Sequence, residues 1–165
     1  MGAARYKRIL AVGEHVPDFH LNDINGFSRS LSEMTSNGPV LLAFYKTTCP
    51  VCQFTFPFLE RIYRQRPDES LSVYAVSQDA ADASRQFSTE FGITFPTLLD
   101  TKASGYPVSN AFGLSTVPSV FLVERDGTIS WSMEGFSRAD MEALAKKTGA
   151  QPFRPGERIP DWKAG

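Results

Sequence analysis

Two short apolar runs dominate the hydrophobic pattern of this chain. Residues 40–45 and 71–77 are mostly apolar over the length of a strand, which is typical of central strands covered on both faces of a sheet. Residues 51–64 place apolar side chains at helical spacing, so this segment is predicted to form a helix. Pro50 fits the first turn, where its missing N–H has no partner to lose. Pro57 lies inside the helix and removes one backbone hydrogen bond, so we expect a kink there.

Turn and capping residues divide the remainder of the chain into shorter elements. The lead-in at 1–13 is expected to be unanchored. Asp79 is the expected N-cap of the second long helix, and Asp126-Gly127 is the expected turn of the last hairpin. The predicted strands lie at 16–21, 27–31, 94–99, 117–123 and 129–134, and the predicted helices lie at 32–34, 80–91, 105–112 and 137–148.

This order of elements predicts the fold class. Strands that alternate with helices, followed by a closing hairpin and helix, indicate an α/β fold with a central mixed β-sheet flanked by helices. The first two predicted strands add an N-terminal β-hairpin extension.

Chain length and the positions of the prolines predict one main domain. A chain of 165 residues is long enough to bury about 70% of its unfolded surface. We assign residues 1–150 to this domain and find no internal repeat. Residues 151–165 contain three prolines and no hydrophobic period. This C-terminal tail is expected either to be a strap held by Phe153, Ile159 and Trp162 or to be loose.

Charge and hydropathy exclude several classes of protein. A net charge of −1 and a pI near 6.1 provide no basic face for nucleic acid or an anionic lipid surface. No run of about 18 apolar residues is present, so no membrane span is expected. The N-terminus has only a four-residue apolar stretch, too short for a signal-peptide core. As written, the chain is expected to be cytoplasmic; trimming of an export signal would leave the same sequence in a periplasmic or exported protein.

The two cysteines, Cys49 and Cys52, are the strongest chemical signal. Their strand–Cys-x-x-Cys–helix context places the first sulfur at a helix N-terminus, where unpaired N–H groups and the helix dipole favour a thiolate. The thiolate is the form that attacks disulfides, so we expect Cys49 to be the accessible nucleophile. Cys52 lies one turn further along, on the face of Phe56, Leu59 and Tyr63. It is expected to be a shielded resolving thiol with a higher pKa.

Three other roles for the cysteine pair stay open. A structural disulfide across so short a loop would contribute only about 2 kcal/mol. A metal site needs about four ligands, and His15 and His20 lie far upstream of the pair. A redox-inert interaction module would carry the pair incidentally. In the redox interpretation no organic cofactor or metal is needed, because the disulfide itself carries two electrons, and the expected partners are protein thiols and disulfides.

Further motifs accompany the cysteine pair between residues 13 and 148. They are 13–19, 44–52, Pro57, 95–100 ending in Asp100, Val117-Pro118 and Asp126-Gly127. This set resembles the thioredoxin superfamily, and within it the TlpA/ResA-like and AhpC/TSA-like redoxin branch. The resemblance implies a thioredoxin-like fold. It also implies that Val117–Pro118 is a cis peptide facing the cysteines, with the Val117 backbone free to pair with an extended substrate. The alternative is an ordinary trans proline that opens a strand.

The chain departs from this family at positions that tune the cysteines. Thr48 stands where many relatives have a Trp before the first cysteine, and Thr55 stands where ResA-like proteins have a Glu. Ala43 stands where thioredoxins have a buried Asp. The resemblance therefore assigns no carboxylate base to Cys52, and water is an acceptable base.

Residues close to the pair have weaker assignments. The charge of Lys46 could stabilise a Cys49 thiolate, and a solvated lysine fits the sequence equally well. Pro50-Val51 is expected to tune the redox potential through the local geometry. Glu60 is expected on the surface.

These observations predict an enzyme, a thiol–disulfide oxidoreductase in which Cys49 forms the mixed disulfide, Cys52 resolves it and Val117–Pro118 docks the partner chain. The alternative enzyme is a thiol peroxidase of the peroxiredoxin type, which reduces hydroperoxides. That family has a Thr three residues before its reactive cysteine and a later Arg. Lys46 and Pro118-Ser119 stand at those positions, and loss of oriented donors disfavours the peroxidase. Both directions of exchange and the oligomeric state stay open.

Overall fold

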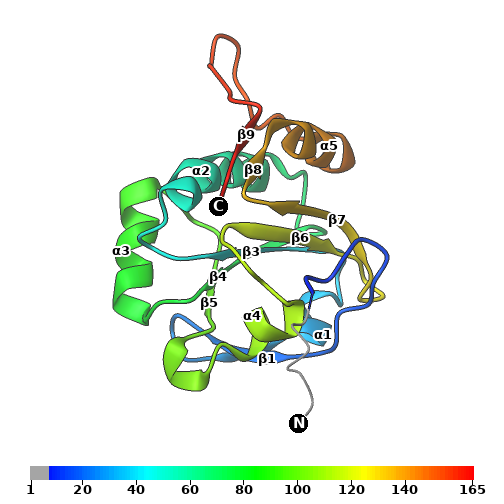
Figure 1. The fold of residues 1–165 in the computed structure, drawn as a ribbon. Coiled ribbons are helices and arrows are strands. Elements are labelled where there is room, and N and C mark those ends of the chain that lie inside the picture. The colour runs from blue at the N-terminus through cyan, green and yellow to red at the C-terminus, as the bar shows by residue number, and fades with distance from the viewer. Residues whose placement is uncertain (1–7) are drawn as a thin grey trace.

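A seven-stranded mixed β-sheet runs through the molecule and has helices against both faces (Figure 1). The computed structural model describes residues 8–165. The strands are β1 (His20–Asp23), β2 (Ser28–Ser30), β3 (Val40–Tyr45), β4 (Ser72–Ser77), β5 (Thr97–Leu99), β6 (Ser119–Val123), β7 (Ile129–Glu134), β8 (Phe136–Ser137) and β9 (Trp162–Lys163). The helices are α1 (Leu31–Met34), α2 (Pro50–Gln65), α3 (Ala81–Phe91), α4 (Pro107–Phe112) and α5 (Arg138–Thr148), with a 3-10 turn at Lys102–Ser104.

Strand β3 carries the reactive end of the sheet. The strand order is β2-β1-β5-β4-β3-β6-β7, and β3 pairs parallel with β4 and antiparallel with β6. Leu41, Ala43 and Tyr45 enter the core beneath α2, α3 and α5. Leu42 and Phe44 enter the second core, beside α1 and α4. Burial on both faces explains why the strand is apolar at every position, and the predicted mixed sheet is confirmed.

The N-terminal hairpin begins later than its alternating pattern predicts. The strand expected at 16–21 is β1, which starts at His20. Asp18 lies before it and accepts hydrogen bonds from the backbone N–H of Ser32 at 3.0 Å and from the Ser32 hydroxyl at 3.3 Å. This side-chain contact ties the segment to α1 in place of ladder pairing, so Pro17 lies outside the strand.

The lead-in is anchored where the structure describes it, which corrects the expectation of an unanchored segment. The N–H of Leu10 donates to the carbonyl of Phe112 at 2.9 Å, and the N–H of Gly13 donates to the carbonyl of Ile129 at 2.8 Å. Residues 1–7 lie outside the described residues.

Two prolines lie at positions where the sequence predicts an effect on the backbone. β6 begins at Ser119, so Val117 and Pro118 precede the strand, because a proline nitrogen has no hydrogen to give to the ladder. Helix α2 continues through Pro57, and the kink expected there stays a prediction.

A side-chain cap explains where α5 begins, and its absence marks the start of α3. The hydroxyl of Ser137 accepts a hydrogen bond from the N–H of Asp140 at 3.2 Å, which confirms the predicted N-cap of α5. The cap predicted at Asp79 is wrong. Ala80 is the N-cap of α3 and makes no side-chain cap bond, because the Asp79 carboxylate is bonded to another loop.

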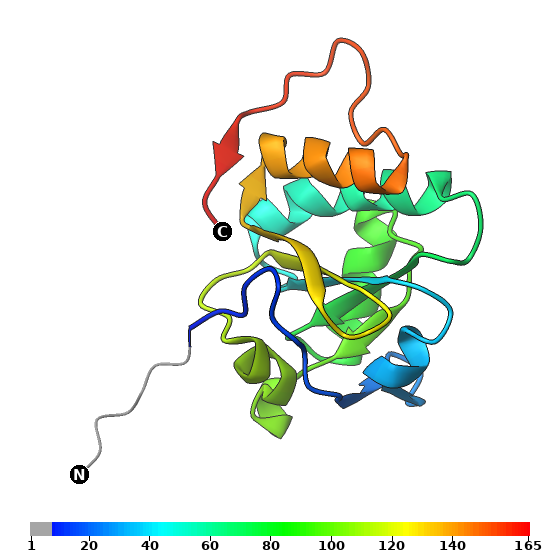
Figure 2. The same cartoon turned by 90° about the vertical axis from the view of Figure 1, so that its right-hand side faces the viewer.

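The C-terminal strap, residues 151–165, leaves the end of α5 and returns to the molecule at β9 (Figure 2, orange to red). Phe153 and Ile159 pack against the core beneath α2 and α5. The Trp162 side chain is 63% exposed and is not an anchor. Its backbone instead pairs with Ser137 in the β8–β9 ladder. Of the two expectations for the tail, a strap or a loose segment, the structure shows the strap, and backbone pairing holds its far end.

Candidate active site

The cysteine pair lies where β3 passes into α2. The chain leaves the sheet at Tyr45 and turns through Lys46–Thr48, with the N–H of Cys49 donating to the carbonyl of Lys46 at 3.2 Å. Cys49 is the N-cap of α2, and Pro50 occupies the first helical turn. The sequence folds in this way because an apolar strand is followed by a turn and then by a proline suited to a helix start.

Cys49 is partly exposed, and among residues 8–165 its sulfur has two polar contacts. Its Sγ accepts a hydrogen bond from the N–H of Cys52 at 3.1 Å. It also lies 3.6 Å from the carbonyl oxygen of Val117, to which the thiol can donate. An N–H donor at a helix N-terminus stabilises negative charge on the sulfur. The geometry therefore suits a thiol that reacts as an anion.

The second cysteine is buried. Cys52 is 0% exposed and packs in the same core as Phe56 and Leu59. Burial, followed by the interaction with the neighbouring Cys49, raises the pKa of the Cys52 thiol. Both the shielding and the raised pKa agree with the sequence-based expectation. Cys52 is consequently a neutral thiol in the reduced protein at ordinary pH.

A cis peptide joins Val117 to Pro118, as the resemblance implies. Val117 is half-buried, Pro118 is buried, and the Val117 carbonyl reaches the Cys49 sulfur. The Pro118 carbonyl accepts a hydrogen bond from the N–H of Gly135 at 2.8 Å. This bond connects the proline segment to the turn between β7 and β8. The structure thus brings together Cys49, Cys52 and Val117–Pro118, which lie far apart in the sequence.

Asp79 positions the turn that precedes Cys49. One oxygen of its carboxylate, Oδ2, accepts hydrogen bonds from the N–H of Thr47 at 2.7 Å and from the Thr47 hydroxyl at 2.9 Å. The side-chain amide of Gln53 donates to the carbonyl of Thr47 at 3.0 Å. Sequence reasoning missed this role. A signal was present, since Asp79 follows β4, and the carboxyl ends of parallel β3 and β4 meet at one edge of the sheet.

The remaining predicted site residues lie around the pair. Thr48 and Pro50 are exposed, and Val51 packs against the core beneath α2. Lys46 is exposed and lines a polar cavity of about 220 Å³ together with Val117. Among the described residues it has no hydrogen bond or ion pair from its ammonium group to the cysteines. No direct contact therefore supports the suggestion that Lys46 stabilises a Cys49 thiolate.

The positions where relatives have carboxylates hold neutral side chains. Thr55 is buried, and its hydroxyl donates to the carbonyl of Val51 at 2.7 Å. Ala43 is buried in the core on the α2 side of β3. Neither side chain can accept a proton from Cys52.

Glu60 is not on the surface, which corrects the prediction. It is 5% exposed. Its carboxylate accepts hydrogen bonds from the N–H of Thr94 at 2.8 Å, from the Thr94 hydroxyl at 2.6 Å and from Nε of Arg64 at 2.6 Å. Burial acts to raise the pKa of Glu60, and these hydrogen bonds outweigh it, so the pKa is lowered. Glu60 holds the segment before β5 against α2 as a structural ion.

The histidines and acidic groups give no further site. Residues 8–165 contain no group of three or more His, Cys, Asp or Glu side chains that could hold a metal ion. His15 bonds through Nε2 to the carbonyl of Asp126 at 2.7 Å, and His20 is exposed. Within the same part of the chain, no helix has the length and apolar character needed to span a membrane.

The fold and the site define a class. A mixed sheet flanked by helices, with a Cys-x-x-Cys pair at a helix N-terminus beside a cis proline, is the arrangement of the thioredoxin-like proteins. The AhpC/TSA family description matches residues 12–132. The chain belongs to the AhpC/TSA family.

Similar proteins agree with this assignment. The chain is 30% identical over 138 residues to the thiol-disulfide oxidoreductase ResA of Geobacillus kaustophilus, covering 82% of this chain and 77% of that protein. The thioredoxin domain of a thiol-disulfide oxidoreductase from Bacteroides vulgatus superposes with a TM-score of 0.73 at 24% identity, covering 84% and 97% of the two chains. Peroxidoxin BcpB from Mycobacterium tuberculosis gives a TM-score of 0.67 at 25% identity, covering 83% and 92%. The predicted thioredoxin-like fold is confirmed.

Proposed function

We propose that this thiol–disulfide oxidoreductase acts through Cys49 as the attacking thiol and Cys52 as the resolving thiol. The proposal rests on the difference in exposure between the two cysteines. Cys49 is partly exposed and receives an N–H bond at its sulfur, whereas Cys52 is fully buried behind it. A substrate can reach the sulfur of Cys49, whereas the sulfur of Cys52 can react only with the neighbouring Cys49 sulfur of the same protein.

The exchange proceeds in two substitutions. The Cys49 thiolate attacks one sulfur of a substrate disulfide, the substrate S–S bond breaks, and the departing thiolate takes a proton from water. The Cys52 thiol then loses its proton to water and attacks the Cys49 sulfur. The Cys49–Cys52 bond forms and the mixed-disulfide bond breaks. The second substrate sulfur leaves as a thiolate and takes a proton from water, so two electrons have passed to the substrate. The reverse sequence oxidises a substrate dithiol. No bound cofactor takes part in this scheme, because the pair itself stores both electrons.

The raised pKa of Cys52 bears on the second of the two steps. Burial and the neighbouring Cys49 both raise this pKa. When Cys49 enters a mixed disulfide, its sulfur no longer carries charge, and one of the two causes disappears. Cys52 therefore ionises more readily after the substrate has bound than before. The mixed disulfide, which is the only stage that offers Cys52 a disulfide sulfur to attack, is thus also the stage at which the Cys52 thiolate forms more readily.

The backbone at Val117 is the proposed docking point for the substrate. Its carbonyl lies 3.6 Å from the Cys49 sulfur, and residues 114–118 precede β6 without helix or strand pairing of their own. An extended segment beside Val117 would place its own cysteine next to Cys49 through main-chain hydrogen bonds. The name of the ResA relatives gives thiols and disulfides as the reacting groups, and this geometry favours thiols and disulfides of proteins as the substrates.

The proposal is tested with single cysteine variants. Cys49→Ser is expected to abolish exchange with a disulfide-bonded protein substrate. Cys52→Ser is expected to accumulate a mixed disulfide at Cys49, visible by mass spectrometry. With the wild-type reduced protein, iodoacetamide is expected to label Cys49 far faster than Cys52. Labelling of Cys52 first, or retained exchange in Cys49→Ser, contradicts the proposed roles.

The direction of exchange is decided by the redox potential. Thioredoxin-like pairs range from about −270 mV for a reductant to about −120 mV for an oxidant. Equilibration of the cysteine pair with glutathione buffers measures this value. A potential near the lower limit assigns reduction of client disulfides, and one near the upper limit assigns oxidation of client thiols.

A further inference from the structure

The C-terminal strap follows one face of α2, the helix that begins at the cysteine pair. The ring of Phe58 packs edge-to-face on Phe153, with centroids 5.2 Å apart. The ammonium group of Lys163 lies 5.1 Å from the ring centroid of Phe54. The α2 residues in contact with the strap are spaced three or four apart, as neighbours on one helical face are; they are Phe54, Phe58, Arg61 and Gln65.

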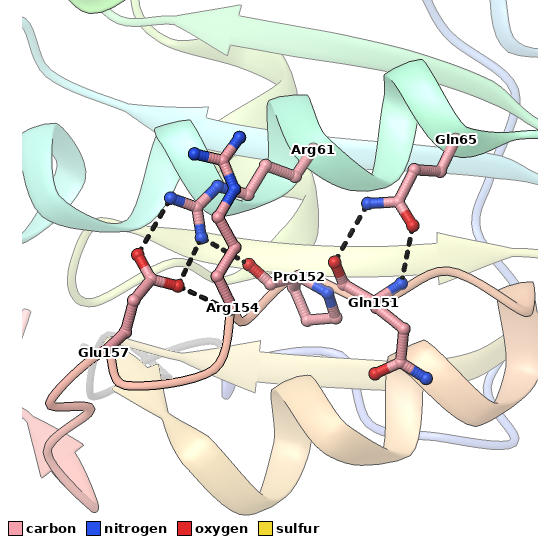
Figure 3. Close-up of polar contacts among 6 residues, drawn as sticks. All are labelled: Arg61, Gln65, Gln151, Pro152, Arg154 and Glu157. Atoms are coloured by element: carbon pink, nitrogen blue, oxygen red, sulfur yellow. Dashed lines mark hydrogen bonds and ion pairs between the residues drawn. The ribbon is translucent and has the colours of Figure 1, made fainter.

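Polar clamps fix the first half of the strap (Figure 3). The guanidinium group of Arg61 donates to both carboxylate oxygens of Glu157, at 2.7 and 2.9 Å, and to the carbonyl of Pro152 at 2.8 Å. Gln65 makes a reciprocal pair with the backbone of Gln151, in which both bonds measure 2.9 Å. A bidentate pair of this kind holds one orientation as well as one distance.

Two glycines let the end of the strap approach the active site closely. A Cβ atom on Gly135 would lie 2.5 Å from the carbonyl oxygen of Lys163, and one on Gly165 would lie 2.4 Å from the carbonyl oxygen of Val117. Both distances are too short for real side chains, so only glycine permits this backbone packing. The end of the strap consequently lies directly on Val117, whose carbonyl also contacts the Cys49 sulfur.

We infer that residues 162–165 of the strap are a displaceable cover over the substrate-docking backbone at Val117, so that the strap makes the enzyme discriminate between polypeptide disulfides and small disulfides. The inference rests on the proposed docking role of Val117. A polypeptide that pairs with this backbone needs the space that the strap end fills. A small disulfide needs access only to Cys49, a residue that is partly exposed with the strap in place.

The contacts of the cover suit a reversible opening. The strap end is held by few contacts: the two residue pairs of the β8–β9 ladder, the N–H of Arg138 bonded to the carbonyl of Asp161 at 2.9 Å, and the packing of Lys163 and Gly165. Residues 161–165 are exposed. The clamps at Arg61 and Gln65 hold the other end. Polypeptide substrates react only with the open form, so their apparent affinity falls in proportion to the open fraction. Loosening either end should therefore raise their rate and leave small disulfides unaffected.

Two variants loosen the strap at different points. Glu157→Gln removes the charge from the Arg61 clamp, and Gly165→Val prevents close packing on Val117. Glu90→Gln, at an exposed glutamate of α3, is the matched control for charge removal. Ala103→Val, at an exposed residue of the 3-10 turn, is the control for added bulk. Hydrogen–deuterium exchange over 158–165 measures how far each variant opens the strap.

The reduced proteins are mixed with 2-hydroxyethyl disulfide or with a disulfide-linked peptide that has extended residues on both sides of its cysteine. Glu157→Gln and Gly165→Val are expected to raise the second-order rate constant for the peptide about two- to fivefold, as expected for loss of one exposed contact. The rate constant of these two variants for 2-hydroxyethyl disulfide should stay at the wild-type value. Both control variants should keep the wild-type rate constants for both disulfides.

Other outcomes overturn the inference. An unchanged or lower peptide rate in both variants means that the strap end does not compete with substrates. Equal changes for the two disulfides mean that the variants act on the cysteine pair and not on docking. Failure of the proposed function is recognised separately, because wild-type protein would then show no Cys49-dependent exchange with either disulfide.

Discussion

Asp79 and Thr47 are 32 residues apart and are joined by two hydrogen bonds to a single carboxylate oxygen, at 2.7 and 2.9 Å. Thr47 lies two residues before Cys49, and Asp79 lies in the loop between β4 and α3. The pair therefore fixes the entry to the redox turn from the neighbouring strand. Gln53, one turn into α2, holds the same residue from the other side through the Thr47 carbonyl.

Loss of this contact should disturb the redox turn. Asp79→Ala leaves the N–H of Thr47 without its acceptor, and it is expected to lower the free energy of unfolding by about 1–3 kcal/mol. A mobile turn also holds the Cys49 sulfur less well against the N–H of Cys52, so alkylation of Cys49 by iodoacetamide at pH 7 should slow. Asp79→Asn keeps an oxygen acceptor and should lie between Asp79→Ala and wild type. Equal stability and alkylation rates in all three proteins would contradict the positioning role.

The raised pKa of Cys52 predicts a dependence of stability on pH in the reduced protein. In the unfolded chain this thiol ionises near pH 8.5, and in the folded protein it stays neutral to higher pH. Its contribution to stability is fully present below about pH 8.5 and is lost as the pH rises above that value. The slope is about 1.4 kcal/mol per pH unit for one proton. Denaturant unfolding between pH 7.5 and 9.5 should show this extra slope in wild-type protein and not in Cys52→Ala. Parallel curves would refute it.

The buried ion Glu60 predicts a second stability effect with the opposite pH dependence. Its folded-state pKa is lowered by hydrogen bonds from Arg64 and Thr94 against the effect of burial. Its contribution is present above the unfolded pKa of about 4.3 and is lost as the pH falls through the lower folded value. Glu60→Gln leaves donors of Thr94 and Arg64 poorly matched and should lower the free energy of unfolding at pH 7 by about 1–3 kcal/mol.

Chemical denaturation measures this change, with Glu90→Gln on the exposed face of α3 as the matched control. The difference between Glu60→Gln and wild type should shrink below pH 4. A Glu60 variant as stable as the control at pH 7 would show that the buried hydrogen bonds contribute nothing net.

The surroundings of Cys49 predict poor peroxidase activity, although a peroxidoxin from Mycobacterium tuberculosis has a similar structure. Within the described part of the chain, the Cys49 sulfur has one N–H donor, from Cys52, and one acceptor, the Val117 carbonyl. Stabilising the charge that develops on a peroxide needs several oriented donors. Hydrogen peroxide should therefore oxidise Cys49 no faster than it oxidises a free thiol of similar acidity.

This prediction is checked by following thiol loss at increasing peroxide concentrations, with disulfide exchange of the same preparation as the control. A linear, slow dependence on peroxide is expected. Rapid, saturable consumption would instead indicate that donors are brought to Cys49 by a rearrangement of the turn.

Local patterns predicted a large part of the fold. β3 was found at its predicted residues, because a strand buried on both faces leaves no polar position in the sequence. The start of α2 follows from Pro50 and the apolar spacing behind it, and the start of α5 follows from the cap at Ser137. The first strand was misplaced, because Asp18 has a partner in α1 that no local pattern indicates.

The amino-acid sequence by itself determined the central strand, the helix that follows it and the placement of two sulfurs one turn apart at its start. These depend on neighbours along the chain, so apolar spacing and capping residues are sufficient to predict them. Only the tertiary structure decided that Asp79 holds the redox turn, that Glu60 is a buried ion and that Gly165 of the strap lies against Val117. Each of these contacts joins segments more than thirty residues apart. Their partners are selected by the packing of strands and helices in space, which sequence spacing does not encode.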